Sequence, residues 1–432
     1  MLKRINSRDL SPPARVPTPG PRRCADRDHS LILRITKIHS GGNEFGFHLT
    51  VKNAAGVHYY EGESELSERD LYTEVTKLQS LWNDRLVTYQ GDNDSPDFYP
   101  FASVYDLSRC DRVADLDAAM RALARGGWEL FRDIFLAYER TDDMRKLGEA
   151  LRAALRSGEQ KLIVISDDFF APWGMMYLPP PGVNMADAGA PWEHTNFLGY
   201  GHYVEHSPAK PRRSPPVITV RGVLRAAINV DTGLDKQFRC HFVADMVRFF
   251  ETTSHRDLRE ERDDLRAAME RDGLSEHLAY FGVHAHVDDF HVTEPPRLTL
   301  TDRENPISPL DLRRWHDDHP RDNGPLIFMN ACRGGQMHSA FHKSFSGILL
   351  MLGARCLIGP HVDLPVAFAG EFARRFFIGV LAGEMVGDVM LRTVREFADE
   401  YRNPFGYTLT MHRGLDTYLD LETAGERGQE AR

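Results

Sequence analysis

The chain has 432 residues, a formal net charge of −10 and an apolar fraction of 42%. This length is enough for two or three folding units, and the apolar fraction suffices for ordinary packed cores. The acidic balance argues against a general nucleic-acid-binding protein, which needs a basic surface. No apolar stretch approaches the ~20 residues of a membrane-spanning helix. From the charge and the hydropathy together, we expect neither nucleic acid nor a membrane as a partner.

Five cysteines are scattered through the sequence, and none of them forms a Cys-x-x-Cys pair. A thiolate zinc site and a disulfide framework are therefore not expected, and no cofactor is indicated. The first residues carry charges and prolines without an apolar segment, which is not typical of a secretory signal. These features predict a reducing, cytoplasmic location.

Two segments precede the main body of the chain. Residues 1–28 hold five prolines among Arg and Ser and are predicted to be a disordered tail. Residues 29–110 contain short β-type runs at 31–35, 45–51 and 57–60, and then a helical pattern. They predict a small α+β module whose role the sequence does not identify, with its helix over 67–82.

The next segment, 115–205, begins with a helical pattern over 114–157 and continues into a strand at 161–166. Residues 206–216 combine prolines with arginines and are predicted to be an exposed linker. A plain connector is the simpler interpretation of this linker, and a proteolytic processing site is the alternative.

In residues 217–420, strand and helix patterns alternate, and 421–432 are predicted to be a second tail. Alternation of this kind indicates an α/β fold with a mostly parallel sheet flanked by helices. The start of one helix is marked by a Ser-Pro-x-Asp cap at Ser308. The predicted strands are 223–230, 278–283, 326–329 and 355–359; 297–302 is a hairpin arm; the other helices are 240–268, 336–352 and 364–381.

A cysteine and a histidine follow two of the predicted strands. Cys332 comes after the strand at 326–329, and His284 ends the strand at 278–283, 48 residues upstream. Active sites of α/β sheets lie at the carboxyl ends of the strands. An imidazole can deprotonate a thiol and later protonate a leaving amine. We therefore predict that His284 and Cys332 form a catalytic dyad.

The backbone N–H groups of Cys332 and Arg333 are candidate oxyanion-hole donors, because glycines follow Arg333 and allow a tight turn. The other two cysteines of the second half, Cys240 and Cys356, are interpreted as packing residues.

A metal site is the competing hypothesis. His284, His286 and Asp288 have the spacing of the H-x-H-x-D-H motif of metallo-β-lactamase-like hydrolases, and this donor set can bind zinc. The sixth position is Asp289 in place of His, and the motif leaves Ala-Cys-Arg-Gly-Gly unexplained. We therefore prefer the dyad and predict no metal.

The same residues resemble the CHAT family of the caspase-like clan, which also holds caspases and separases. Residues 281–285 are similar to the family's strand ending in His-Gly, and 329–335 to its Ser-Ala-Cys-x-x-Gly element. Ala285 stands where the family has a Gly that offers an oxyanion N–H, so the resemblance implies the N–H of Ala285 as a further oxyanion donor. Gly174 stands where the family has Glu after Pro-Trp. The resemblance covers about 115–418, with further similar segments at 165–176, 197–200, 352–360, 380–384 (the closing helix) and 403–407 (the terminal strand).

The resemblance implies a regulated cysteine endopeptidase acting on protein substrates in bacterial antiviral defence or cell-death signalling. It assigns 115–205 to an N-terminal half and 217–420 to a catalytic half, with control from an activating partner or a ligand of the 29–110 module. A catalytically silent scaffold of the same fold is the alternative. For substrate binding it implies Asp231, Asn330 and Asp363. Asp231 could attract a basic P1 residue, although an ordinary turn aspartate is the simpler interpretation.

Overall fold

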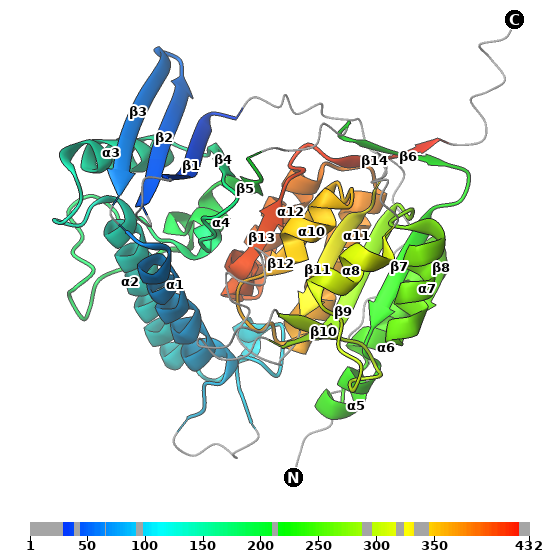
Figure 1. Cartoon of the computed structure of the whole chain (residues 1–432). Coiled ribbons are helices and arrows are strands. Elements are labelled where there is room, and N and C mark those ends of the chain that lie inside the picture. Colours follow the sequence, from blue (N-terminus) through cyan, green and yellow to red (C-terminus); the bar gives the residue numbers. More distant parts are fainter. Residues whose placement is uncertain are drawn as a thin grey trace, which may run out of the picture.

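The computed structural model describes residues 29–38, 44–64, 66–91, 98–209, 215–286, 296–316, 324–331 and 345–422. Within these ranges the chain forms one large sheet with helices packed against it, and a separate two-stranded sheet in which residues 217–221 pair with 418–422 (Figure 1). None of the helices there combines the length and the apolar character that a membrane span requires. The predicted tail 1–28 lies outside the described residues, whereas the first residues of the predicted tail 421–432 end a strand.

From here on, the N-terminal half means residues 29–209, which contribute five strands. Their secondary structure follows from local sequence patterns. Leu31, Leu33 and Ile35 are buried on one face of the first strand, while Arg34 between them is exposed. Ser67 caps the first helix through a reciprocal capping box. The elements are β1 (Leu31–Ile38), β2 (Glu44–Asn53), β3 (Gly56–Ser64), α1 (Glu68–Trp82), η2 (Asn83–Val87), η3 (Leu107–Arg109), α2 (Val113–Phe135), α3 (Asp142–Arg156), β4 (Lys161–Ile165), η4 (Trp173–Met175), η5 (His194–Asn196), α4 (Leu198–Gly201) and β5 (Tyr203–Ser207).

The C-terminal half alternates strands and helices, as the sequence predicts. Its elements are β6 (Val217–Arg221), β7 (Arg225–Val230), α5 (Gly233–Phe238), α6 (Phe242–Thr253), β8 (His255–Arg259), α7 (Arg262–Asp272), β9 (Leu278–His286), β10 (Arg297–Thr299), α8 (Pro309–Trp315), β11 (Leu326–Ala331), α10 (Gly347–Met351), β12 (Cys356–Pro360), α11 (Val366–Leu381), α12 (Val386–Glu400), η7 (Pro404–Thr408), β13 (Leu409–His412) and β14 (Tyr418–Glu422).

The two halves share one 12-stranded sheet in the order β3-β2-β1-β4-β5-β13-β12-β11-β9-β7-β8, with β10 added to β9. Of the ten neighbouring pairs on this path, seven are parallel and three antiparallel. The predicted α/β class is therefore confirmed. The strands of the N-terminal module are continuous with this sheet, because β1 pairs in parallel with β4; the domain boundaries stay a prediction.

Helices cover both faces of the sheet in the C-terminal half. On one face Tyr280 of β9 packs against Phe250 of α6 and Phe377 of α11. On the other face Phe281 belongs to a second buried cluster that includes Trp315 of α8 and residues of α7 and α10. Both faces of β9 are therefore buried, which leaves the strand ends for polar side chains.

Four predicted boundaries differ from the structure. β8 lies inside the predicted helix 240–268, because its sequence His-Arg-Asp-Leu-Arg forms an edge strand with little apolar character. β9 extends past His284, because β10 pairs with its last three residues. His206 and Ser207 are buried in β5 and do not belong to an exposed linker. Pro404–Thr408 is a 3-10 helix, so the terminal strand is β13.

Candidate active site

The two predicted catalytic residues start from paired positions of neighbouring strands. β9 and β11 pair in parallel, and Val283 is the register partner of Ala331. His284 follows Val283 and is buried in β9. Cys332 follows Ala331 in the sequence, but it lies outside the described residues, as does Arg333. The structure therefore describes the histidine side of the predicted dyad.

His284 contacts a carboxylate from the adjacent strand end. Asp231 directly follows β7, and its backbone N–H donates to the carbonyl of Gly282 at 2.8 Å. Its Oδ2 lies 3.3 Å from Nε2 of His284. This separation is within ion-pair reach, and the contact is not a hydrogen bond in this structure. Such contacts at catalytic sites are often long before substrate binds.

The Asp231 carboxylate is fully buried and held by two more donors. Its Oδ1 accepts the backbone N–H of Gly233 at 2.7 Å. Its Oδ2 accepts Nε–H of Arg303 at 2.8 Å, and the Arg303 guanidinium also donates to Gln237 at 3.1 Å. Arg303 is a site residue that the sequence did not indicate. A lone arginine in a loop gives no sequence signal, because its partner is 72 residues away.

Ala285, a predicted oxyanion donor, lies within β9 opposite Leu298 of β10. The non-glycine residues with positive φ in the described part of the chain are Arg239, Arg402 and Arg413. Ala285 is not among them, so its backbone conformation accommodates a side chain without strain. Ala at this position thus carries no backbone penalty, and the oxyanion role stays a prediction.

The predicted substrate-binding residues occupy different surroundings. Asn330 is buried, and its amide nitrogen donates to the Ala369 carbonyl at 2.8 Å and to the Tyr280 hydroxyl at 3.2 Å. These bonds tie β11 to α11 and β9. Asp363 is half-buried in the loop between β12 and α11. A substrate contact by either side chain stays a prediction.

The metal hypothesis stays untested, because Asp288 and Asp289 lie outside the described residues. Within the described ranges no three His, Cys, Asp or Glu side chains gather as metal ligands.

Cys240 and Cys356 are free thiols in packed surroundings. Burial raises the pKa of Cys240 to about 12. Burial also raises the pKa of Cys356 well above its usual value. Because the thiolate is the nucleophile, neither cysteine is poised to react at neutral pH.

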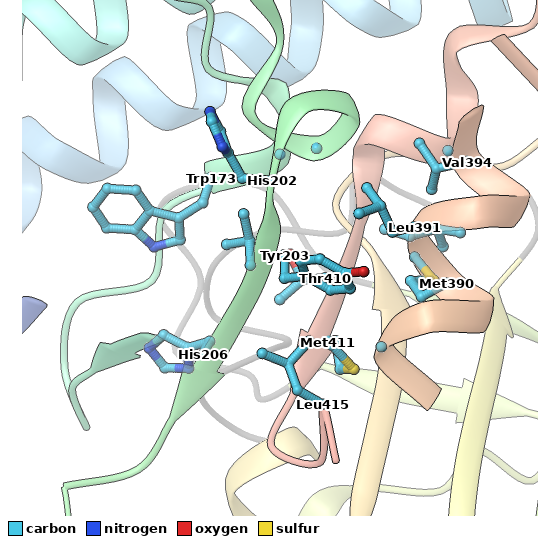
Figure 2. Close-up of a pocket in the computed structure, with 16 residues that line it drawn as sticks. Trp173, His202, Tyr203, His206, Met390, Leu391, Val394, Thr410, Met411 and Leu415 are labelled. Carbon is cyan, nitrogen blue, oxygen red and sulfur yellow. The ribbon is translucent and has the colours of Figure 1, made fainter. Parts of the chain in front are cut away.

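A pocket lies where the two halves meet, away from the strand ends that carry His284 and Asp231. It is lined by His202, which follows α4, and by residues of β5, α12 and β13, among them Tyr203, Met390 and Met411 (Figure 2). Burial lowers the pKa of His202 to about 4, so this imidazole is neutral at physiological pH. None of the predicted site residues lines this pocket.

No family model and no curated protein sequence matches the chain. The chain is similar to two crystal structures of the Saccharomyces cerevisiae separase–securin complex. The TM-scores are 0.46 and 0.43, each with 10% sequence identity over 90% of this chain and 30% of the solved chain. The chain thus spans less than a third of the length of the solved chains that it matches.

Proposed function

We propose that the chain is a regulated cysteine endopeptidase in which Cys332 is the nucleophile and His284 the base. The observation that carries the proposal is the register pair Val283 and Ala331, since the residues after them are His284 and Cys332. The imidazole would take the thiol proton, and the thiolate would attack the peptide carbonyl. His284 would then protonate the leaving amine, and water would hydrolyse the thioester.

The finer assignment follows the CHAT resemblance: a protease that acts on protein substrates in bacterial antiviral defence or cell-death signalling, controlled through the N-terminal module or a partner. One contact supports such control. Gln79 of α1 donates to the carbonyl of His361 at 2.8 Å, in the loop that also carries Asp363. A ligand that shifts α1 would therefore act directly on a loop at the end of β12.

The test is proteome-wide mapping of new peptide N-termini. Full-length wild-type protein, Cys332→Ala and His284→Ala are each incubated with a whole-cell lysate. We expect new N-termini with the wild type and none with either variant. Cys110→Ala, which removes a half-buried thiol from the N-terminal half, is the matched control and should cleave like the wild type.

Cleavage that persists at the wild-type level in both site variants would reject the proposal. If that residual cleavage were abolished by EDTA, it would favour the metal-dependent hydrolase. A Cys332 with ordinary thiol reactivity, unaffected by His284→Ala, would favour the silent scaffold.

A further inference from the structure

Asp231 has two carboxylate oxygens with separate partners in the interior of the protein. The Gly233 N–H holds Oδ1, whereas Oδ2 faces both Arg303 and His284. The Asp231 side chain is 0% exposed. A buried carboxylate is costly unless it is paired and hydrogen-bonded, and these contacts supply that pairing.

We propose that Asp231 is the positioning residue for His284, and that Arg303 tunes it. Asp231 fixes the orientation of the imidazole through the contact between its Oδ2 and Nε2 of His284, and the proposed proton exchange depends on that orientation. The negative charge also stabilises the imidazolium that forms when the thiol ionises. This inference rests on the proposed function, because it assumes that His284 activates Cys332.

The placement of Asp231 argues against direct recognition of a basic P1 side chain. A specificity carboxylate must be open to substrate, whereas Asp231 is fully buried and already holds an arginine of its own chain. Arg303 is about half exposed, with 45% of its side chain accessible, and shares the oxygen that faces His284. Arg303 therefore weakens the electrostatic interaction between the Asp231 carboxylate and the imidazole.

Alkylation of Cys332 by iodoacetamide tests the inference in the full-length protein. The reagent is small and uncharged and has no P1 group, so its rate reports thiolate formation and not substrate recognition. The rate at pH 7 is followed by mass spectrometry of the Cys332 peptide. We expect Asp231→Asn to slow alkylation at least tenfold, close to the rate of His284→Ala. The fraction folded is checked by circular dichroism.

Glu276→Gln is the matched control. Glu276 is also a buried, ion-paired acid, with Arg259 as its partner, but it lies at the opposite end of β9. Its loss should lower stability and leave the alkylation rate within about twofold of the wild type.

The outcomes separate the two proposals. If His284→Ala alkylates as fast as the wild type, the proposed function fails. If His284→Ala is slow but Asp231→Asn is unchanged, only the positioning role is overturned. If Asp231→Asn left the alkylation rate unchanged but raised the KM for peptides with a basic P1 residue, Asp231 would instead be the specificity residue.

If Asp231→Asn does not fold, Arg303→Gln tests whether Asp231 positions His284. The Gly233 N–H still orients the carboxylate in this variant, and the whole Asp231 charge then acts on His284. We expect alkylation to accelerate about threefold. A slower or unchanged rate would overturn the inference, because a purely structural ion pair predicts no gain.

Discussion

The two halves of the sheet bury their strands differently. In the N-terminal half β1 and β4 alternate between buried and more exposed positions, so one sheet face is covered. In the C-terminal half all five residues of β12 are buried, and β7 is buried from its second residue onward. Parallel strands with helices on both faces are expected to read as continuous apolar runs.

This difference determines where a candidate catalytic residue can be recognised in the sequence. A strand that is buried on one face only carries polar residues along its whole length, so a single His or Asp in it does not indicate a site. In the two-sided half the strand bodies are apolar, and Asp231, His284 and Asn330 appear only near the carboxyl ends. The candidate site lies in this half because α/β proteins place their active sites at the carboxyl ends of such strands.

The halves meet at β5 and β13, which we call the seam. Only two register pairs join these strands, namely Glu205 with Met411 and His206 with His412. Burial raises the pKa of Glu205 to about 7, although the Leu415 N–H donates to its carboxylate at 3.0 Å. The seam therefore combines a short strand ladder with a buried acid.

The largest expected effect tests the two-sided burial of β11. Ile327→Ala and Phe328→Ala change adjacent residues that face opposite clusters, and both side chains are fully buried. Each should cost about 2–5 kcal/mol of unfolding free energy, measured by urea denaturation. On β1, Leu33→Ala should cost as much, whereas exposed Arg34→Ala should stay within about 0.5 kcal/mol. Similar losses of stability at both β1 positions would contradict the burial of β1 on one face only.

The next effect concerns pH and the seam. The folded protein holds the Glu205 proton up to a pKa of about 7, while the unfolded chain releases it near the ordinary 4.5. This group therefore favours the folded state below pH 4.5, and that contribution is lost as the pH rises to 7. A shift of this size corresponds to about 3 kcal/mol. Glu205→Gln should thus be more stable than the wild type at pH 8 and nearly equal at pH 4.5.

Urea unfolding at both pH values checks this expectation. Glu149→Gln is the control, because its carboxylate is about half exposed on α3 and should show no such pH-dependent gain. If Glu205→Gln were destabilised equally at both pH values, the carboxylate would be ionised in the folded protein.

The smallest expected effect tests the close packing of η4 against η7 beside the seam. A Cβ at Gly174 would lie 2.5 Å from the Tyr407 carbonyl oxygen, so the glycine allows η4 to approach η7. Gly174→Ala should cost about 1–3 kcal/mol. Gly189→Ala has open space and should change stability by less than about 0.5 kcal/mol, as read from thermal unfolding. Equal midpoints for the two variants would show that the seam relaxes easily.

Much of the fold was predictable because its signals are local. The cap at Ser308, the alternation of β1 and the apolar runs of β9 and β11 each follow from neighbouring residues. β8 was missed because an edge strand needs little apolar character. The extension of β9 was missed because it depends on pairing with β10, which is a tertiary contact.

The α/β class and the main apolar strands could be derived from the sequence, which also predicted that a histidine and a cysteine carry the chemistry. Tertiary structure alone decided that Asp231 faces His284 and Arg303, and that Glu205 is buried at the seam. The physical reason is that periodicity reports which face of a segment is buried, whereas strand order determines which distant charges meet. That order arises from packing over the whole sheet.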